Sequence, residues 1–464
     1  MMSDHGADAT TILYNSKSDV SSDLLVQFSK ARTEALVPYT RGLTSQIYRL
    51  RVDDDGASNR QYCLKRVMEE DEMPPHSIRR EMMCYRIINE ERKHETPIIT
   101  LLAAFRDESD PFSVAIDLIM PLYSCTLEEL MDEPLMQFNI GDLDQKVTIA
   151  SEQRPAFLLA RKIQSFSLHS YLHSTCQAVF SALSFLHSHS IAHRDIKPSN
   201  ILVNAGTLSI VLIDFGTCYL KSYREGDDGL GGMTSEVGTG AYRAPESLFS
   251  PLNGYNVFKL DIWQAGVTLI QFFLPLKKVE VAMAREERQI EIVKEDSDSI
   301  DDRPEWEKAL WADDAGLSWS KLEDVWNSDK SKGELKNGFY DNEYDDDDDD
   351  EKEESMSGWK RETLFDATRG DLGLANSMFD LKGLPQNTSD WTEAEHFQPS
   401  LSRMPFTRRP PAIGGIQQRL SRNGMPPTIF PIIDILDQCI QLSSSKRISA
   451  DEAVEQLQRA LSKS

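Results

Sequence analysis

Alternation of polar and apolar residues predicts strands in the first quarter of the chain. Residues 46–52 alternate in this way, and after an acidic turn residues 62–67 form a second apolar-rich run. Residues 98–122 predict two more strands around a polar break at 107–111. A period of two is the pattern of a strand with one buried face. We therefore expect a small antiparallel sheet.

A helix is expected between these two pairs of strands. Pro74 and Pro75 precede a stretch that runs through Asn89 without a strong helix breaker. Proline is well tolerated at the start of a helix, since its missing N–H has no partner there anyway. We interpret residues 35–122 as one β-rich lobe. Residues 1–22, rich in Ser, Asp and Thr, are expected to be disordered.

The remainder, residues 123–464, is expected to form a larger helical lobe. It contains a polar insert near 141–154 and a long insert at about 277–361. Six apolar residues recur at helical spacing and predict one buried stripe: Leu168, Leu172, Cys176, Val179, Leu183 and Leu186. His169 and His173 are four apart on this helix, but no acid lies beside them as in a zinc-binding helix, so we expect a structural role.

A large part of the net negative charge lies in one short segment of the chain. The formal net charge of −25 argues against nucleic acid or an anionic membrane surface as the main ligand. Residues 341–354 contain eleven acids and one lysine, so the folded part is much less acidic than the total. Four tryptophans precede this run, namely Trp306, Trp311, Trp319 and Trp326. A solvated loop and a partner-docking segment both fit this composition.

Cysteine usage and apolar runs bear on the compartment. The six cysteines show no paired spacing, which favours reduced thiols in a cytoplasmic or nuclear protein over a disulfide framework or a zinc site. The N-terminus lacks a secretory signal pattern. No run approaches the roughly 18–20 apolar residues of a membrane span.

The candidate chemistry lies in one loop and one triplet. His193-Arg194-Asp195-Ile196-Lys197-Pro198-Ser199-Asn200 is followed by Asp214-Phe215-Gly216 and then by Ala244-Pro245-Glu246. In this order Asp195 can accept the proton of a Ser or Thr hydroxyl, and Lys197 can neutralise phosphate charge. Asn200 and Asp214 can hold Mg²⁺ against ATP phosphates.

With these motifs the chain resembles a eukaryotic protein kinase from about Leu36 to the C-terminus. The resemblance implies an α+β, two-lobed protein kinase fold with a β-rich N-lobe and a helical C-lobe. It implies ATP and Mg²⁺ as cofactors, and serine or threonine as the acceptor because of Lys197. Lys65 would pair with Glu81, and Thr239 would bond Asp195 and Lys197.

Supporting residues follow from the same resemblance. His193 would hold the catalytic loop through backbone bonds, and Asp261 would orient that loop. Glu246 and Arg447 would form a structural ion pair in the large lobe. The adenine-side linker would lie near Met120 and Tyr123.

The expected phosphate-covering loop departs from the family pattern. It keeps one glycine, Gly42, with Thr40 and Ser45 at the flanking glycine positions. A Cβ at those points restricts close approach of the backbone to phosphates. An inactive kinase acting as a scaffold is therefore one alternative, although every catalytic residue further along is present.

Further signatures resemble the cyclin-dependent kinase group. Arg243 precedes Ala244-Pro245-Glu246, and residues 370–391 resemble the segment after the seventh helix of those kinases. The glycine-poor loop is similar to that of fungal kinases that activate cyclin-dependent kinases as single chains. Thr234 aligns with the threonine that cyclin-dependent kinases phosphorylate.

The phosphate cradle for Thr234 is incomplete. Arg80 and Arg194 are two expected members, but Tyr219 stands near the place of the third arginine. Lys221 or Arg224 can substitute for it, or the kinase is active without this phosphate.

The resemblance thus implies a monomeric CDK-activating kinase that phosphorylates a cyclin-dependent kinase without a cyclin. A cyclin-requiring kinase with another substrate is the alternative.

Overall fold

The computed structural model describes most of the chain outside the long insert. Its described residues are 10–34, 36–42, 45–52, 62–92, 96–110, 113–133, 146–148, 165–204, 206–223, 233–249, 253–280, 357–385, 390–398, 400, 403–404, 406–422 and 427–461. The chain divides into two compact units. The first comprises Met1–Leu276, Arg361–Gln398 and Arg408–Ser464, and the second comprises Lys277–Lys360 and Pro399–Thr407.

Little of the second unit is described. Strands β14 (Leu276–Glu280) and β15 (Ser357–Arg361) pair with each other at the two ends of the predicted insert. The acidic run at 341–354 and the four tryptophans before it lie outside the described residues.

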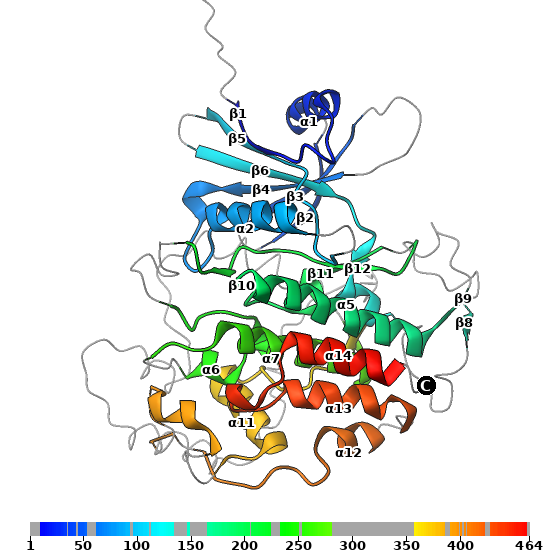
Figure 1. Ribbon diagram of the computed structural model, residues 1–464, viewed down its shortest axis with the longest axis vertical. Helices are drawn as coiled ribbons and strands as arrows, with labels where there is room; N and C mark the ends of the chain where they lie inside the picture. Colours follow the sequence, from blue (N-terminus) through cyan, green and yellow to red (C-terminus); the bar gives the residue numbers. More distant parts are fainter. Residues whose placement is uncertain are drawn as a thin grey trace, which may run out of the picture. The chain divides into compact units, whose positions relative to one another are not determined.

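The small lobe is built on a six-stranded antiparallel sheet in the order β1-β5-β6-β4-β3-β2 (Figure 1). Its strands are β1 (Thr10–Asn15), β2 (Leu36–Arg41), β3 (Gln46–Leu50), β4 (Tyr62–Met68), β5 (Ala103–Asp110) and β6 (Ser113–Pro121). The predicted strands at 46–52 and 62–67 are confirmed as β3 and β4, with Tyr48 opposite Leu64.

The N-terminal segment differs from the expectation of a disordered tail through residue 22. Residues 10–15 form β1, which pairs with β5 from Thr10 opposite Asp107 to Asn15 opposite Ala103. The next helix, α1 (Ser22–Glu34), begins at the end of the supposed tail. The Ser, Asp and Thr content of this segment did not predict β1, because an edge strand is held by backbone hydrogen bonds and needs few apolar side chains. Residues 1–9 lie outside the described residues.

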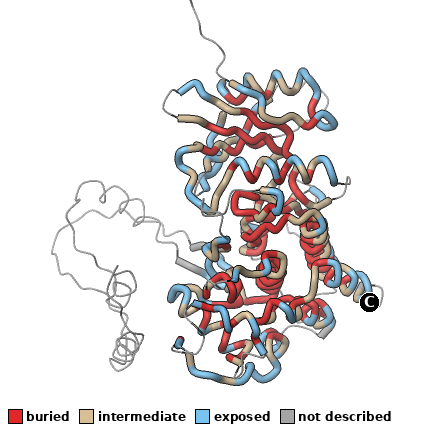
Figure 2. The backbone as a smooth tube through the Cα atoms, turned by 60° about the vertical axis from the view of Figure 1, so that its left-hand side comes forward, coloured by how far each residue is buried: buried red, intermediate tan, exposed pale blue. Residues whose placement is uncertain are grey.

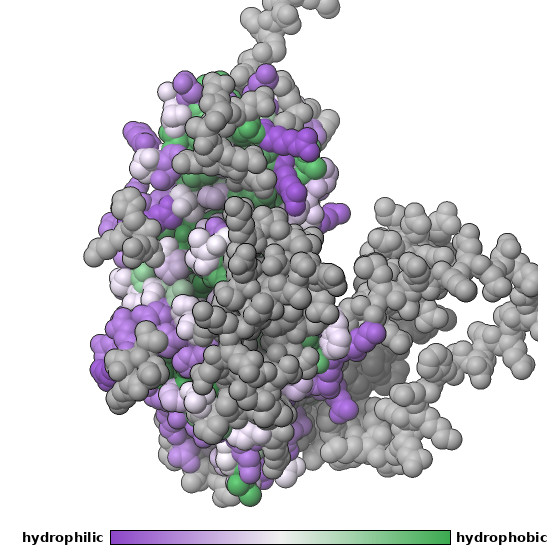
Figure 3. Space-filling view, turned by 90° about the vertical axis from the view of Figure 1, so that its right-hand side faces the viewer, coloured by the Kyte–Doolittle hydropathy of each residue, from purple (hydrophilic) through white to green (hydrophobic). Residues whose placement is uncertain are grey.

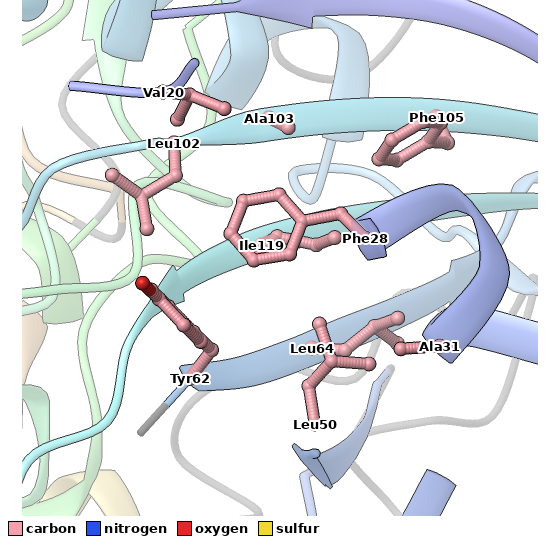
Figure 4. Packing of buried hydrophobic residues seen from close by; sticks show 10 residues of the cluster. All are labelled: Val20, Phe28, Ala31, Leu50, Tyr62, Leu64, Leu102, Ala103, Phe105 and Ile119. Carbon is pink, nitrogen blue, oxygen red and sulfur yellow. The ribbon is translucent and has the colours of Figure 1, made fainter. Parts of the chain in front are cut away.

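Helix α1 covers one face of this sheet and buries an apolar cluster. Phe28 and Ala31 of α1 pack against sheet residues that include Leu50, Leu64 and Ile119. Figure 4 shows the Phe28 ring reaching from the helix toward Ile119 and Tyr62. The Phe28 and Tyr62 rings meet edge to face at 4.9 Å. Burial of this kind contributes about 25 cal/mol per Å² of apolar surface, so α1 is an integral part of the lobe.

Helix α2 (Ile78–Glu91) follows β4 and lies on the other side of the sheet from α1 (Figure 1). The helix begins three residues after Pro75 rather than at it. Its N-cap is Ser77, whose hydroxyl accepts from the Arg80 amide at 3.3 Å. A serine cap satisfies one of the unpaired amides of the first turn.

The larger lobe is mostly helical. Its helices are α3 (Leu127–Met131), α5 (Leu168–Ser188), α6 (Pro245–Leu248), α7 (Val257–Ile270), α11 (Gly370–Lys382), α12 (Gly415–Arg422), α13 (Phe430–Cys439) and α14 (Ala450–Leu461). Its short strands are β7 (Cys125–Thr126), β8 (Lys146–Thr148), β9 (Ser165–Ser167), β10 (Ile191–Ala192), β11 (Ile201–Val203), β12 (Ile210–Leu212) and β13 (Tyr219–Leu220). Strands β8 and β9 pair at the predicted polar insert, most of which is not described.

Helix α5 carries the predicted apolar stripe. Five of the six stripe residues are buried: Leu172, Cys176, Val179, Leu183 and Leu186. The side chain of Leu168 lies outside the described ones. His173 is buried too, and its Nε2 lies 2.8 Å from the Leu457 carbonyl oxygen of α14. This contact agrees with a structural role for His173.

Two buried clusters hold the large lobe together. The expected ion pair is present, with Arg447 Nη1 and Nη2 donating to the Glu246 carboxylate at 2.5 and 2.7 Å. An aromatic cluster joins Phe249, Trp391 and Phe397, with the rings of Trp391 and Phe397 5.0 Å apart. In Figure 2 the buried residues, drawn red, run through the small sheet and through the helices of the large lobe.

The surface shows no membrane-spanning element among the described residues. No described helix is both long enough and apolar enough to cross a bilayer. On the face drawn in Figure 3, the described surface residues are mostly hydrophilic, and hydrophobic side chains show only in small separate areas.

We predict that α1 stabilises the small lobe through Phe28. Phe28→Ala should lower the free energy of unfolding by about 3–5 kcal/mol, because it leaves a cavity in a fully buried cluster. Val26→Ala on the same helix is the control, since Val26 is 69% exposed and should change stability by less than about 0.5 kcal/mol. Urea denaturation measures both. Equal, small effects would mean that α1 does not pack as described.

Candidate active site

The loop at residues 193–200 is held in place by hydrogen bonds to side chains of the buried helix α7. The Asp261 carboxylate accepts from the His193 amide at 2.9 Å and from the Arg194 amide at 2.7 Å. The same carboxylate lies 2.9 Å from Nε2 of His187 on α5. Asp261 is fully buried, and a buried carboxylate is stable only when such donors surround it. The orienting contacts expected of Asp261 are present.

Gln264, one turn further along α7, holds the middle of the loop. Its side chain accepts from the Ile196 amide at 3.0 Å and donates to the Arg194 carbonyl at 2.9 Å. Gly238 approaches this amide so closely that a Cβ on it would lie 2.5 Å from Gln264 Nε2. The φ of Gly238 is 84°, which favours glycine as well. Sequence reasoning had not identified Gln264, since a buried glutamine in an apolar helix carries no motif.

Two motif residues have left-handed backbone. Arg194 has a φ of 66° and Asp214 a φ of 67°. Non-glycine residues rarely adopt this region, and where they do it often marks a functional constraint. His193 lies beside Arg194, and its Nε2 is 2.8 Å from the carbonyl oxygen of Ile213, the residue just before the Asp-Phe-Gly triplet.

The loop and the later threonine form one polar cluster around Asp195. Thr239 donates to Asp195 Oδ1 at 2.8 Å, and Lys197 Nζ lies 2.9 Å from Asp195 Oδ2. Lys197 also donates to the Thr239 hydroxyl at 2.7 Å. Asn200 Nδ2 donates to Asp195 Oδ2 at 3.1 Å and to its carbonyl at 2.8 Å. The contacts predicted for Thr239 are therefore present.

Lys65 joins the small lobe to the Asp-Phe-Gly triplet. Its Nζ donates to Glu81 Oε1 at 2.9 Å and to Asp214 Oδ1 at 2.8 Å. Burial alone lowers the pKa of Lys65, but the charges of Asp214 and Glu81 outweigh burial and hold that pKa above its ordinary value. Lys65 is therefore a fixed cation at neutral pH.

The pKa values of Glu81 and Asp214 shift in opposite directions. Burial raises the pKa of Glu81, and the charge of Lys65 only partly offsets this. Burial also acts to raise the pKa of Asp214, but there the charge and hydrogen bond of Lys65 prevail and the pKa lies below its ordinary value. Asp214 is thus the carboxylate best suited to stay ionised beside a cation.

Aromatic rings connect these parts. Phe215 meets Tyr85 of α2 edge to face at 5.2 Å and lies 4.9 Å from the His193 ring. His76, just before α2, is a neighbour that sequence reasoning missed. A Cβ on Gly216 would lie 3.2 Å from His76 Nδ1 and 3.5 Å from Asp214 Oδ1. Only the position of His76 before the helix could have pointed to it.

The remaining predicted ligand residues lie at the sheet. The Gly42 amide donates to the Ser45 carbonyl at 2.8 Å across a tight turn between β2 and β3, while Leu43 and Thr44 lie outside the described residues. Thr40 is a β2 residue paired with Ile47, not a turn residue. Met120 is buried in β6, opposite Cys63.

Tyr123 lines a cavity away from the Lys65 and Asp195 clusters. This cavity of about 980 Å³ is also lined by Asp19, Arg92 and Ser174, and by none of Lys65, Asp195 or Asp214. Burial raises the pKa of Tyr123.

The two arginines expected around Thr234 are engaged elsewhere. Arg194 Nε donates to the Thr217 carbonyl at 2.7 Å, and Arg80 donates to the Pro75 and Gly216 carbonyls. Thr234 caps a short turn, with its hydroxyl accepting from the Glu236 amide at 3.0 Å.

The structure describes only one of the two substitutes for the third arginine, namely Lys221. Tyr219 is paired with Ala192 in the ladder of β10 and β13. Lys221 is exposed, and Arg224 lies outside the described residues. The residues after the Asp-Phe-Gly triplet are thus held by a strand ladder and by backbone bonds.

The donor set at Asn200 and Asp214 suits a hard cation. The amide nitrogen of Asn200 is used by Asp195, so its oxygen is the atom left to face a ligand. Carboxylate and amide oxygens are the ligands that Mg²⁺ prefers, usually together with substrate phosphates and water. No group of three or more His, Cys, Asp or Glu among the described residues forms a metal site by itself.

Comparison with known proteins agrees with this geometry. The family model described as "Protein kinase domain" matches residues 41–457. A CBL-interacting serine/threonine-protein kinase 15 from Arabidopsis thaliana is 40% identical over 105 residues, 22% of this chain and 23% of that protein. Serine/threonine-protein kinase stk11 from Xenopus laevis is 40% identical over 106 residues, 22% of each.

A third relative matches over a longer stretch. Serine/threonine-protein kinase CAK1 from Saccharomyces cerevisiae is 25% identical over 226 residues, which is 46% of this chain and 57% of that protein. The chain therefore spans less than a quarter of the length of the first two relatives and a little more than half of this one.

We predict a pH signature for Asp214. Its folded pKa is below the ordinary 3.8, so its ionised form stabilises the fold above about pH 4, and this contribution is lost as the pH falls. The difference in free energy of unfolding between wild type and Asp214→Asn should therefore shrink from pH 6 toward pH 3. Asp380→Asn, on an exposed surface, is the control. A difference that stays constant or grows on acidification would contradict the pairing with Lys65.

Proposed function

Because the chain belongs to the protein kinase domain family, we propose that it is an ATP-dependent serine/threonine protein kinase. The observation that carries this proposal is the cluster of Lys197, Thr239 and Asn200 around Asp195. The Lys65, Glu81 and Asp214 triad accompanies it. Together they supply a base, cations for phosphate charge and oxygen ligands for a metal, which phosphoryl transfer requires.

The proposed reaction moves the γ-phosphoryl group of ATP to a hydroxyl. The bond from the γ-phosphorus to the β,γ-bridging oxygen breaks, and a bond from that phosphorus to the substrate oxygen forms. The hydroxyl proton goes to the Asp195 carboxylate, and ADP leaves. Lys197 is placed to neutralise charge on the transferred group, because its Nζ lies 2.9 Å from Asp195. Most of the rate then comes from positioning and electrostatic stabilisation.

Nucleotide and metal contacts are assigned by the same logic. Lys65, oriented by Glu81, would bind the α- and β-phosphates. Asn200 and Asp214 would hold Mg²⁺, which offsets phosphate charge when bound. Gly42 would lie over the phosphates, with fewer glycines than the family pattern provides. Met120 and Tyr123 would border the adenine.

For the substrate, we propose the activation-loop threonine of a cyclin-dependent kinase, with this chain acting as a monomer and without a cyclin. The similarity to CAK1 over 46% of the chain supports it, as does the glycine-poor turn at Gly42. Arg80 donates to the Gly216 carbonyl and Arg194 to the Thr217 carbonyl, so backbone contacts support the segment that begins at Gly216. We further propose a cytoplasmic and nuclear location, since the six cysteines are free and buried.

We predict that Asp195→Asn abolishes most turnover. Positioned acid–base groups contribute roughly 10²–10⁴-fold, so kcat should fall by this factor while ATP affinity changes little. Asp380→Asn is the control, because Asp380 is exposed and its partners, Arg409 and Asn376, lie outside the candidate site. Transfer of labelled phosphate from ATP to a serine or threonine peptide measures both. Near-normal turnover by Asp195→Asn would refute the role of the base.

We predict that Thr234→Ala keeps most activity toward an unphosphorylated cyclin-dependent kinase, within about twofold, because no charge-assisted phosphate bonds are needed to order the segment. Thr239→Ala should lower activity, since it removes the bridge between Asp195 and Lys197. Incorporation of phosphate into that substrate by purified, cyclin-free variants measures both.

The outcomes separate the alternatives. Activity that appears only after a cyclin is added would identify a cyclin-requiring kinase. Activity that only phosphorylated wild type shows would make Thr234 a switch. No turnover at all, with Mg-ATP binding retained or lost, would favour the scaffold.

A further inference from the structure

The segment before the matched domain is tied firmly into the small lobe. The family match begins at residue 41, yet β1 and α1 precede it and are ordered. After β1, the Ser16 amide donates to the Leu102 carbonyl at 2.9 Å, and its hydroxyl donates to Asp19 at 2.5 Å. This turn directs the chain into α1, whose Phe28 is buried on the sheet.

A buried charge network fastens the same segment. Arg32 of α1 is 1% exposed, and its Nη1 donates to Asp117 of β6 at 2.7 Å and to Asp107 of β5 at 3.2 Å. Its Nη2 donates to Thr10 of β1 at 2.5 Å. Asp117 is shared with Arg66, the residue next to Lys65 on β4, at 2.7 Å. The extension thus joins the strand that carries Lys65.

On its other side, β1 contacts α2, the helix that carries Glu81. Arg86 Nη2 donates to the Leu13 carbonyl at 2.5 Å, and the Arg86 guanidinium lies 5.9 Å from the centre of the Tyr14 ring. Asn89 Nδ2 donates to the Tyr14 hydroxyl at 2.8 Å. We call these contacts of Leu13 and Tyr14 with Arg86 and Asn89 the β1–α2 tie.

We propose that the N-terminal extension, residues 10–34, positions α2 so that Glu81 meets Lys65 within a single chain. Arg86 and Asn89 follow Glu81 on the same helix, so at 1.5 Å per residue the tie lies about 8 to 12 Å along the helix from Glu81. A displacement of α2 away from the sheet would break the tie and the Lys65–Glu81 pair together. Leu13, Tyr14, Arg86 and Asn89 are positioning residues, because they act through Glu81.

The β1–α2 tie supplies, within the chain, a positioning contact on α2 that would otherwise have to come from a partner protein. Kinase catalysis requires the lysine–glutamate pair to be in place, and the position of this helix is the usual point of control. A contact that forms only when α2 is placed for catalysis stabilises that position of α2 by the free energy of the contact. The fraction of molecules in which Glu81 meets Lys65 therefore rises. The inference rests on the proposed kinase function, and it explains how that function can proceed without a second subunit.

The test uses the full chain and spares the buried cluster. Tyr14→Phe with Arg86→Ala removes the hydroxyl contact and the guanidinium, while leaving Phe28 and Arg32 intact. Arg86→Lys with wild-type Tyr14 is the conservative variant. Ile12→Ala, on β1 and 53% exposed, is the control. Each change is made in wild type and in Glu81→Gln, and kcat and the peptide KM are measured at saturating Mg-ATP.

We expect the double variant to lower kcat about fivefold in wild type, since two hydrogen bonds are lost, and to leave the peptide KM unchanged. In the Glu81→Gln background it should lower kcat no further, because the residue through which the tie acts is gone. Arg86→Lys should retain most activity and Ile12→Ala all of it. Equal losses in both backgrounds, or no loss in wild type, would overturn the proposal.

A second readout does not depend on turnover. Amide hydrogen exchange of α2 should be faster in the double variant than in wild type or Ile12→Ala, since a released helix opens more often. If wild type transfers no phosphate, the proposed function fails, and exchange alone decides the positioning role. Unchanged exchange in α2 would overturn it in either case.

Discussion

The buried ion pair between Lys65 and Glu81 is the contact on which the rest of the site depends. It joins β4 to α2 at 2.9 Å, and Asp214 completes it from the large lobe at 2.8 Å. Removing such charges from water costs several kcal/mol per ion, so the pair forms only where the surrounding structure fixes both partners. The opposite pKa shifts of Glu81 and Asp214 reflect this competition, since Lys65 offsets burial fully at one carboxylate and partly at the other.

The two sides of the pair are supported differently. On the large-lobe side, buried Asp261 and Gln264 of α7 fix the loop through its backbone. On the small-lobe side, α2 buries Cys84, Tyr85 and Ile88, and its Arg86 and Asn89 also contact β1. The loop is thus fixed within the large lobe, and the N-terminal extension adds to the contacts that position α2.

The sequence motifs predicted the candidate site more completely than the hydrophobic periodicity predicted the fold. Asp195, Lys197, Asn200, Asp214, Lys65 and Glu81 come together as the sequence predicts, because motif spacing reflects a fixed loop geometry. Strand β1 and its tie to α2 could not be predicted, since an edge strand is held by backbone bonds and its partners are remote in sequence. Gln264 and His76 carry no local signal. The engagement of Arg80 and Arg194 by carbonyls also depends on tertiary geometry alone.

A double-mutant cycle on Lys65 and Glu81 tests the central claim most directly. The quantity to measure is kcat/KM for ATP in the lone, monomeric chain, for Lys65→Met, Glu81→Gln and the pair together. If the two residues act as one unit, each single change should cost nearly as much as both, with a large coupling energy. Independent effects that multiply in the double variant would contradict the account, because Glu81 would then not be acting through Lys65.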